Sequence, residues 1–434
     1  MLPSPDQLRI RRLGAPRVAS PLASRGVVLV ADELGVLIPS DTEELSGVDG
    51  PVPAFEAAGP RSELFLDPKK ASIGIVTCGG LCPGTNDVIR AIVLTAWHEY
   101  GVRRVLGFRY GYAGLATSSG APPVTLDPSA VHEIHGLGGT ILGSSRGPQQ
   151  LGDMVDELQR LQIDVLFAIG GDGTLTGASE LAGEITRRNL PIAVIGIPKT
   201  IDNDILWLER SFGFATAVNE AARSIVAAHT EAHAVRNGIG LVKLMGRYSG
   251  FIAAHATLAH NQVNFCLIPE SPFSLDGKRG FLSLLERRVE TRGHAVIVVA
   301  EGAGQEHTRR DGPAVDASGN PRLADIGLFL KERILEHFGS RGVVASSKYI
   351  DPSYLIRSLP ANAFDSALCL TLGQHAVHAG LSGRTDMLVG TWGGRYTHVP
   401  LPLAISERRQ LDVEGAVWQR VLEATGQPGV MRDA

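Results

Sequence analysis

Two short polar runs near the middle of the chain constrain its fold most, because each directly follows an apolar run of strand length. The first is GGDGT at 170–174, and the second is PKTIDND at 198–204. Both runs are therefore predicted to lie at the carboxyl ends of parallel strands. In an open α/β sheet this edge binds ligands, because its loops face a crevice and helix N-termini point toward it.

The residue types of GGDGT favour a phosphate site. Its three glycines allow positive φ angles and bring backbone N–H groups close to an anion. Asp172 would repel a polyphosphate unless a cation such as Mg²⁺ bridged the two, since hard cations bind carboxylate and phosphate oxygens together. Taken alone, the run is equally typical of a tight strand-to-helix turn, with Thr174 near the helix start.

The second run carries the groups that phosphoryl transfer to an alcohol needs. It offers one ammonium, one hydroxyl and two carboxylates within six residues. One carboxylate can orient the attacking hydroxyl and accept its proton, and a cation can stabilise charge on the transferring group. A surface loop can have the same composition, but two such runs on consecutive strand ends favour a shared site.

Composition argues against several classes of function. The chain has 434 residues, enough for two or three domains, and its formal net charge of −4, without a basic stripe, gives no sign of nucleic-acid binding. No apolar run approaches the ~18 residues needed to span a bilayer, so no membrane partner is expected. Four scattered cysteines favour a reducing, cytoplasmic compartment. The arginine-rich residues 1–26 are interpreted as a loosely docked leader, with a transit peptide as the alternative.

The composition and the hydrophobic pattern of the sequence change at about residue 71. Residues 1–70 are rich in proline and glycine and are predicted to form an extension with a hairpin built from the apolar runs 26–31 and 36–38. Beyond this point strand-length apolar runs alternate with helical patterns, which predicts a parallel sheet. One of the later strands is expected at 343–347.

Two more glycine-rich loops follow predicted strands in the first half of the chain. They are CGGLCPGTN at 78–86 and GGTILGSSRG at 138–147. Arg146 could clamp a phosphate through its guanidinium group, or it could be a solvated surface residue. Cys78 and Cys82 have no second Cys/His pair at ligand spacing, which argues against a zinc site.

Eight motifs, in their order along the chain, resemble the 6-phosphofructokinase family from Ala71 to about Leu403. They are GGLCPGTNDVIR, GGTILGSSRG, IGGDGT, GIPKTIDNDI, VKLMGRYSGFIA, LIPESPF, AEGAG and KYIDPSYLIR. The chain is most similar to the plant- and kinetoplastid-type, ATP-dependent branch of the long, pyrophosphate-enzyme-like members. Related lipid and dinucleotide kinases share the GGDGT turn but lack the PKTIDND and MGR runs.

The resemblance implies an α/β fold with two Rossmann-like three-layer domains of mostly parallel sheets. The nucleotide-binding domain would span 71–213, with the chain returning to it from about 357. The sugar-phosphate-binding domain would span 214–356, and residues 404–434 would form a C-terminal helical tail. The resemblance also implies an allosteric, glycolytic enzyme that is a homo-oligomer, either a dimer or a tetramer.

The implied activity is transfer of the γ-phosphoryl group of ATP to the 1-hydroxyl of fructose 6-phosphate, with Mg²⁺ as cofactor. The residues implied for ATP are Gly80, Arg146, Gly147, Gly171, Asp172, Gly173 and Thr174, with Asp172 on the metal. Asp202 would be the base, and Thr200 and Arg247 would assist catalysis. The residues implied for the sugar phosphate are Thr200, Ile201, Asp202, Met245, Gly246, Arg247, Glu301, Lys348, Tyr354, Leu355, Ile356 and Arg357.

Two positions bear on the choice of phosphoryl donor. In this family a glycine at the position of Gly173 leaves room for the α-phosphate of ATP, whereas pyrophosphate users have an aspartate there. Lys199 is shared with pyrophosphate enzymes, and the combination of this glycine and lysine resembles the plant-type ATP enzymes. The alternatives are a pyrophosphate-dependent, reversible enzyme and a non-catalytic, nucleotide-sensing subunit of the same fold.

One position departs from the pattern of the short bacterial members. Those proteins bring an arginine from the neighbouring subunit to the sugar phosphate, seven residues before the methionine of MGR. This chain has Gly238 there, and Arg236 or Lys348 are the candidates to replace the missing arginine.

Overall fold

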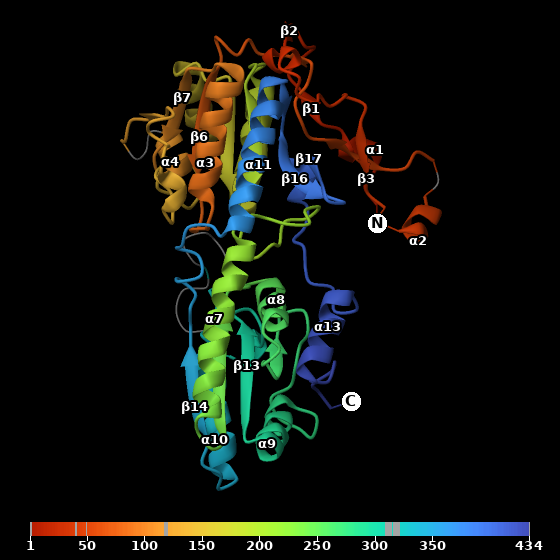
Figure 1. Ribbon diagram of the computed structural model, residues 1–434, viewed down its shortest axis with the longest axis vertical. Coiled ribbons are helices and arrows are strands. Elements are labelled where there is room, and N and C mark those ends of the chain that lie inside the picture. The colour runs from red at the N-terminus through yellow and green to blue at the C-terminus, as the bar shows by residue number, and fades with distance from the viewer. Residues whose placement is uncertain are drawn as a thin grey trace. The chain divides into compact units, whose positions relative to one another are not determined.

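The computed structural model describes residues 2–39, 41–48, 50–116, 120–308, 315 and 322–433. The chain forms two compact units and passes between them several times. Unit 1 comprises Met1–Thr200, Ile205–Gly213 and Ser358–Arg408, and unit 2 comprises Ile201–Asp204, Phe214–Arg357 and Arg409–Ala434. Each unit has its own largely parallel sheet covered by helices, so the predicted α/β class is confirmed (Figure 1).

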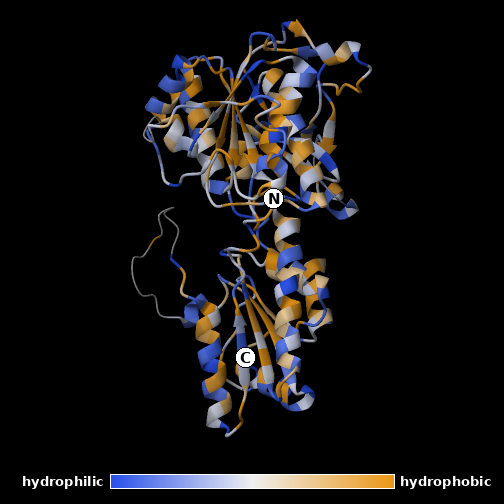
Figure 2. Ribbon diagram, turned by 60° about the vertical axis from the view of Figure 1, so that its left-hand side comes forward, coloured by the Kyte–Doolittle hydropathy of each residue, from blue (hydrophilic) through white to orange (hydrophobic). Residues whose placement is uncertain are grey.

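Unit 1 is built on a nine-stranded sheet in the order β3-β4-β17-β16-β10-β9-β6-β7-β8. The strands are β3 (Gly35–Leu37), β4 (Ala54–Ala57), β6 (Ser72–Thr77), β7 (Arg104–Phe108), β8 (Val124–Thr125), β9 (Val165–Gly170), β10 (Ala193–Pro198), β16 (Met387–Trp392) and β17 (Arg395–Pro400). Those from β16 to β7 run parallel, and β6, β9 and β10 are buried along their whole length. Such continuous apolar strands, orange in Figure 2, need cover on both faces.

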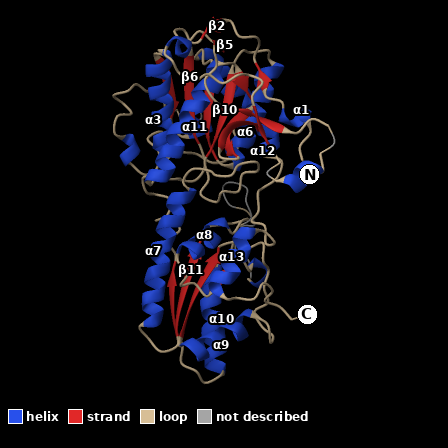
Figure 3. Cartoon of the chain, turned by 45° about the vertical axis from the view of Figure 1, so that its right-hand side comes forward, coloured by secondary structure: helices blue, strands red, loops and turns tan. Residues whose placement is uncertain are grey.

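The direction of the crossovers puts helices on both faces of this sheet. β6 leads through α3 (Thr85–Leu94) to β7 on one side, whereas β9 leads through α6 (Asp172–Arg187) to β10 on the other. Because such crossovers are right-handed, steps in opposite directions place α3 and α6 on opposite faces. α3 packs against α11 (Ala363–Leu381), as Figure 3 shows, and α6 packs against α5 (Leu151–Arg160).

Residues of the N-terminal extension add strands to unit 1. β4 pairs with β17 and β3 pairs with β4, both antiparallel. Farther along, β1 (Arg11–Arg12) pairs with β15 (Arg384–Thr385), and β2 (Val18–Ala19) pairs with β5 (Glu63–Leu64). The hairpin predicted from 26–31 and 36–38 is therefore wrong in its first half. Residues 27–31 form no strand, and β3 pairs with β4 instead. The side chain of Phe55 in β4 is fully buried in the core, whereas Val28 is 85% exposed.

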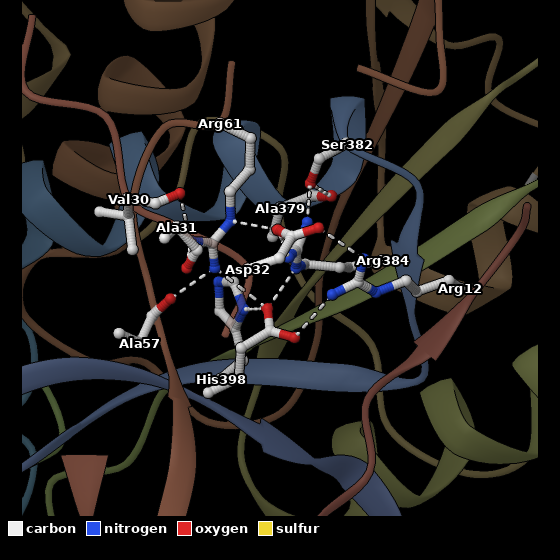
Figure 4. A network of polar contacts seen from close by, with 11 residues as sticks. Arg12, Val30, Ala31, Asp32, Ala57, Arg61, Ala379, Ser382, Arg384 and His398 are labelled. Carbon is white, nitrogen blue, oxygen red and sulfur yellow. Dashed lines mark hydrogen bonds and ion pairs between the residues drawn. The ribbon is translucent and has the colours of Figure 1, made fainter. Parts of the chain in front are cut away.

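A buried network of charges fastens this extension to the sheet (Figure 4). Arg384, only 1% exposed, donates a hydrogen bond of 2.7 Å to Asp32 and another to Glu56. Arg61 also pairs with Glu56, at 3.1 Å. It donates further to three backbone carbonyls, those of Val30 at 2.8 Å, Ala31 at 2.9 Å and Ala57 at 2.6 Å. The network thus joins the extension to the strand that follows α11.

Glu56 is the anionic centre of this network. Burial by itself would raise the pKa of its carboxyl group, but the hydrogen bond with His398 and the charge of Arg384 lower that pKa well below its usual range. Nδ1 of His398 lies 2.9 Å from Oε1 of Glu56, and burial lowers the pKa of His398 to about 4. At neutral pH the pair is therefore a carboxylate beside a neutral imidazole.

We expect Glu56→Gln to lower the free energy of unfolding by about 3–5 kcal/mol, because it removes the buried carboxylate and leaves the buried guanidinium groups of Arg61 and Arg384 to share Asp32. Urea titration at pH 7, followed by circular dichroism, measures the loss. Glu63→Gln is the matched control, since Glu63 is exposed in the same extension and should change stability by less than about 0.5 kcal/mol. Equal effects of the two substitutions would show that the network carries no stability.

Two buried histidines, His378 and His398, and the partly buried His375 give unit 1 a defined sensitivity to acid. Burial lowers the pKa of His375 to about 4, that of His378 to about 3 and that of His398 to about 4, from an ordinary value of 6.5. Between pH 6.5 and about 4 the unfolded chain therefore binds protons that the folded chain does not. The stability from these groups is complete above pH 6.5 and is lost as the pH falls through this window.

The free energy of unfolding should fall between pH 6.5 and pH 5 by about 1.4 kcal/mol per pH unit for each histidine. Urea titrations at several pH values measure this slope. His378→Gln should reduce the slope, whereas His132→Gln, at an exposed position, should leave it unchanged. A stability that stays constant down to pH 5 would contradict the assignment of these buried groups.

Unit 2 is built on a four-stranded parallel sheet in the order β12-β13-β11-β14. Its strands are β11 (Gly238–Leu244), β12 (Phe265–Leu267), β13 (His294–Ala300) and β14 (Ser346–Ile350). Its helices are α7 (Phe214–His233), α8 (Phe251–Ala259), α9 (Phe281–Arg292), α10 (Ile326–Ser340) and α13 (Ala416–Thr425). The strand expected at 343–347 begins later, since pairing with β11 starts where Gly238 meets Ser346.

The last segment of the chain is part of the packing of unit 2. α13 contacts α8 and β12. Beyond α13, the amide of Gln427 donates to the carbonyl of Cys266 at 3.1 Å and accepts from its N–H at 2.6 Å. These bonds satisfy the N–H and the carbonyl group of Cys266 in the edge strand β12. In the ranges that the structure describes, no helix combines the length and the apolarity needed to cross a membrane.

Candidate functional site

The strand order of unit 1 reverses between β6 and β9, and this reversal marks the expected ligand site. In open α/β sheets ligands bind at such a switch point, outside the carboxyl ends of the strands. Thr77 of β6 lies beside Ile169 of β9, and Gly170 of β9 lies beside Pro198 of β10. The loops that begin at residues 78, 171 and 199 therefore start next to one another.

Hydrogen bonds hold these loops together and add the loop 138–147 to them. The N–H of Lys199 donates to the carbonyl of Gly170 at 2.9 Å. The N–H of Gly79 donates to the carbonyl of Ser145 at 3.0 Å, and Oγ of Ser144 donates back to the carbonyl of Gly79 at 2.6 Å. Loops that lie far apart in the sequence thus meet at one edge of the sheet.

The GGDGT run turns directly from β9 into α6. A Cβ added at Gly170 would come within 2.1 Å of Oγ1 of Thr174, so this position has room only for glycine. A Cβ added at Gly173 would meet no atom within 4 Å, so the first turn of α6 opens onto empty space. Because a helix begins with N–H groups that have no intrahelical partner, this turn is suited to an anion.

Asp172 places a carboxylate at this turn, with 34% of its side chain exposed. Among the described residues, no group of three or more His, Cys, Asp or Glu side chains is arranged to hold a metal ion. The residues therefore fit a cation that arrives with oxygen ligands of its own, as Mg²⁺ does on a polyphosphate. They do not fit a metal held by protein side chains alone.

Lys199 and Arg146 differ in how accessible their side chains are to a ligand. Lys199 is 5% exposed, and its Nζ donates to the carbonyl of Gly80 at 2.5 Å, which ties the loop after β6 to the end of β10. Arg146 and Gly147 are exposed, and Gly147 has a φ of 89°, which favours glycine. An exposed guanidinium beside these loops is available as a phosphate clamp.

The PKTIDND run divides between the two units. Thr200 belongs to unit 1, where Oγ of Ser211 donates to its carbonyl at 2.7 Å. Asp202 belongs to unit 2, where Oγ of Ser249 donates to its carbonyl at 3.3 Å. Asn203 has a φ of 55°, in the left-handed region that asparagine tolerates, so the chain turns sharply just after Asp202.

In unit 2 the loops after β11 and β13 are bonded to each other at the carboxyl edge. The N–H of Glu301 donates to the carbonyl of Leu244 at 2.8 Å, and that of Gly302 donates to the carbonyl of Gly246 at 3.1 Å. A Cβ added at Gly302 would lie 2.0 Å from the carbonyl oxygen of Arg247, so the loops can approach only through glycine. The sheet therefore brings the MGR run and Glu301 together.

The electrostatics around Glu301 suit a phosphorylated ligand. Burial raises the pKa of its carboxyl group, and the positive charges of Arg247, Lys243 and Arg357 oppose this rise. A carboxylate or carboxylic acid can bind sugar hydroxyls, while guanidinium groups bind phosphate oxygens. The edge of this sheet thus combines both kinds of partner.

The run Tyr354–Arg357 lies in the loop that follows β14. The guanidinium of Arg357 lies 4.9 Å above the ring of Tyr354, and Ile356 is buried. Tyr354 and Leu355 are 74% and 70% exposed. Lys348 is exposed within β14, where it pairs with Gly240, so it lies in the strand and not in the loop at its end.

The position of Gly238 explains why it carries no side chain. A Cβ added there would lie 2.0 Å from the carbonyl oxygen of Ala232, so an arginine does not fit at the start of β11. Met245 follows the other end of this seven-residue strand. Arg236 precedes the strand, so within one chain it lies far along β11 from the MGR run, roughly 20 Å or more at 3.3 Å per residue.

Reasoning from the sequence missed two charged residues. Nζ of Lys243 lies 3.0 Å from Asp325 and 2.8 Å from Asp351, at the start of the loop that leads to Arg357. Burial would lower the pKa of Lys243, but these hydrogen bonds raise it. A lone lysine within the apolar strand GLVKL was the available signal. The second residue is Arg408, whose Nη2 lies 2.9 Å from Oδ2 of Asp172.

Two units with largely parallel sheets and glycine-rich loops at their carboxyl edges define a Rossmann-like α/β protein whose loops suit anionic ligands. The family model described as phosphofructokinase matches residues 72–380. The chain belongs to the phosphofructokinase family.

Relatives with curated names cover most of the chain. A protein named ATP-dependent 6-phosphofructokinase from Borreliella burgdorferi is 50% identical over 385 residues, which is 87% of this chain and 86% of the relative. One of the same name from Amycolatopsis methanolica is 48% identical and covers 98% of this chain and 95% of its own length. ATP-dependent 6-phosphofructokinase 1 of Arabidopsis thaliana is 47% identical, covering 88% and 80%. The resemblance to the ATP-dependent, plant-type branch is confirmed.

A solved structure supports the fold independently of close sequence similarity. The pyrophosphate-dependent phosphofructokinase from Marinobacter aquaeolei has a TM-score of 0.68 and covers 84% of this chain and 92% of its own. It is 19% identical, so the match concerns the fold alone. The predicted phosphofructokinase fold is confirmed.

Proposed function

We propose that the protein transfers the γ-phosphoryl group of ATP to the 1-hydroxyl of fructose 6-phosphate, producing fructose 1,6-bisphosphate and ADP. The observation that carries this proposal is the identity of 47–50%, over most of the chain, with relatives named ATP-dependent 6-phosphofructokinase. The open first turn of α6 and the cationic surroundings of Glu301 support it chemically. The reaction belongs to glycolysis, for which a cytoplasmic location and a homo-oligomeric enzyme, dimer or tetramer, are proposed.

The donor would bind at the switch point of unit 1, which we propose as the nucleotide-binding domain. Its contacts would come from Gly80, Arg146, Gly147, Gly171, Asp172, Gly173 and Thr174. Asp172 would hold Mg²⁺, which neutralises charge on the polyphosphate when it is bound. The N–H groups of the first turn of α6 would orient the phosphates, and the guanidinium of Arg146 would bind an outer oxygen.

The absence of a side chain at Gly173 supports ATP as the donor. An aspartate there would add a second carboxylate to a turn that already carries Asp172, and it would repel the α-phosphate. Lys199 does not oppose this assignment, because its ammonium is engaged with the carbonyl of Gly80. It would set the shape of the loop after β6 and act on the donor through that loop.

The acceptor would bind in unit 2, which we propose as the sugar-phosphate-binding domain. Its contacts would come from Thr200, Ile201, Asp202, Met245, Gly246, Arg247, Glu301, Lys348, Tyr354, Leu355, Ile356 and Arg357. Arg247 and Arg357 carry the positive charge that phosphate oxygens require. Glu301 would accept hydrogen bonds from sugar hydroxyls.

Asp202 would act as the general base. As the 1-hydroxyl oxygen forms its bond to the γ-phosphorus, the hydroxyl proton passes to the carboxylate of Asp202, and the bond between the β-γ bridging oxygen and the γ-phosphorus breaks. Thr200 would hydrogen-bond near the reacting groups, and Arg247 would stabilise negative charge on the transferring group. ADP leaves with the bridging oxygen.

The donor assignment is tested by giving the purified protein fructose 6-phosphate with either ATP or pyrophosphate. Turnover with ATP and Mg²⁺, coupled to the formation of fructose 1,6-bisphosphate, is the expected result. Turnover with pyrophosphate alone would make the protein the reversible, pyrophosphate-dependent form. Binding of nucleotide without turnover under any condition would make it a non-catalytic sensor.

Asp202→Ser should lower kcat by roughly two to four orders of magnitude while leaving fructose 6-phosphate binding within about threefold, because the substitution removes the base and the other proposed contacts to the sugar phosphate remain. Steady-state kinetics measure kcat, and equilibrium titration measures binding. Asp153→Ser, at an exposed position of α5, is the matched control and should retain wild-type kcat. Near-normal turnover by Asp202→Ser would show that the base lies elsewhere.

A further inference from the structure

An ion pair in unit 1 engages the one carboxylate of the GGDGT turn. Nη2 of Arg408 lies 2.9 Å from Oδ2 of Asp172, and both side chains are about one-third exposed, at 35% and 34%. Such a partly exposed pair contributes little to stability, with typical values of about 0–1 kcal/mol. The pair can therefore break at little cost when either group gains a stronger partner.

The backbone on both sides of Arg408 is fixed. Arg408 forms an antiparallel bridge with Ile205, in the segment that follows PKTIDND. It is the last residue of unit 1, and the N–H of Arg409 donates to the carbonyl of Asp204 at 2.9 Å within unit 2. Before it, α12 (Leu401–Ala404) packs against α6. The guanidinium is thus presented to the first turn of α6 from a segment more than two hundred residues away in the sequence.

The chemistry of a bound metal–nucleotide complex allows Arg408 to exchange its contact with Asp172 for one with a phosphate group. A carboxylate that binds Mg²⁺ gives its oxygen electrons to the cation, and a guanidinium close to that cation is repelled. Polyphosphate oxygens then offer the guanidinium a bidentate anionic partner. The exposure of Arg408 allows its side chain to change partners without leaving a buried charge behind.

We propose that Arg408 is a donor-binding residue, paired with Asp172 in the nucleotide-free protein and transferred to a phosphate oxygen when the metal–nucleotide complex takes Asp172. This inference rests on the proposed function, because it needs a polyphosphate at the switch point. Before the nucleotide arrives, Arg408 masks the carboxylate that would repel it. After the nucleotide has bound, the guanidinium of Arg408 strengthens the binding of the donor.

The test compares the affinity for MgADP of the wild-type protein, Arg408→Gln and Arg187→Gln, measured by isothermal titration calorimetry without sugar phosphate so that no turnover occurs. Arg408→Gln should bind MgADP about ten- to one-hundredfold more weakly, the usual effect of losing a charge-assisted hydrogen bond. Arg187→Gln makes the same charge change on the exposed far end of α6 and should bind as the wild type does. Unchanged affinity in Arg408→Gln would overturn the proposal.

A second pair of measurements separates the exchange of partners from a long-range electrostatic attraction between Arg408 and the nucleotide. In EDTA, Asp172 stays paired with Arg408, so the ratio between the dissociation constants of Arg408→Gln and wild type for ADP should be smaller than with Mg²⁺ and should reflect only the repulsion from the unmasked Asp172. An equal ratio with and without Mg²⁺ would overturn the exchange. Arg408→Lys keeps the charge but not the forked donor, and should show an intermediate loss with Mg²⁺. If Arg408→Gln does not fold, Arg408→Lys still tests the proposal. Wild-type affinity of Arg408→Lys for MgADP would then contradict it.

The outcomes distinguish this inference from the proposed function. If the wild-type protein binds no nucleotide and does not use ATP, the proposed function fails. If it binds MgADP and uses ATP while Arg408→Gln binds MgADP equally well, only the role of Arg408 fails.

Discussion

The side-by-side register of β6, β9 and β10 is the constraint on which the candidate donor site depends. Fully buried parallel strands need helices on both faces, and right-handed crossovers in opposite directions force the strand order to reverse between β6 and β9. That reversal opens the edge where the loops after all three strands begin. Without this register, the glycines of GGDGT and of the loop after β6 would belong to unrelated turns.

The ion pairs described above differ in how deeply they are buried. Glu56 is enclosed by Arg61, Arg384 and His398, so its network holds the N-terminal extension on the sheet and cannot open cheaply. The pair of Asp172 and Arg408 is about one-third exposed, so the exchange of partners that we propose would leave no buried charge behind. In unit 2, Lys243 lies between these limits and holds the loop that carries Arg357. The same chemistry serves structure or ligand binding according to its access to water.

The acceptor chemistry that we propose depends on a chain that passes repeatedly between two units. PKTIDND is divided, with Thr200 in unit 1 and Asp202 in unit 2, and the crossing at Arg408 and Arg409 pairs with the same segment. The groups assigned to donor and acceptor are therefore covalently linked through short connections.

The sequence by itself determined the α/β class, most strand and helix positions, and the glycine-rich loops, because periodicity and turn residues are local signals. It also determined the family, since eight ordered motifs seldom coincide by chance. Only the tertiary structure decided the partner of β3, the start of β14, and the positions of Lys243 and Arg408. These depend on pairing and charge contacts between distant segments, such as the more than two hundred residues between Asp172 and Arg408, which no local pattern records.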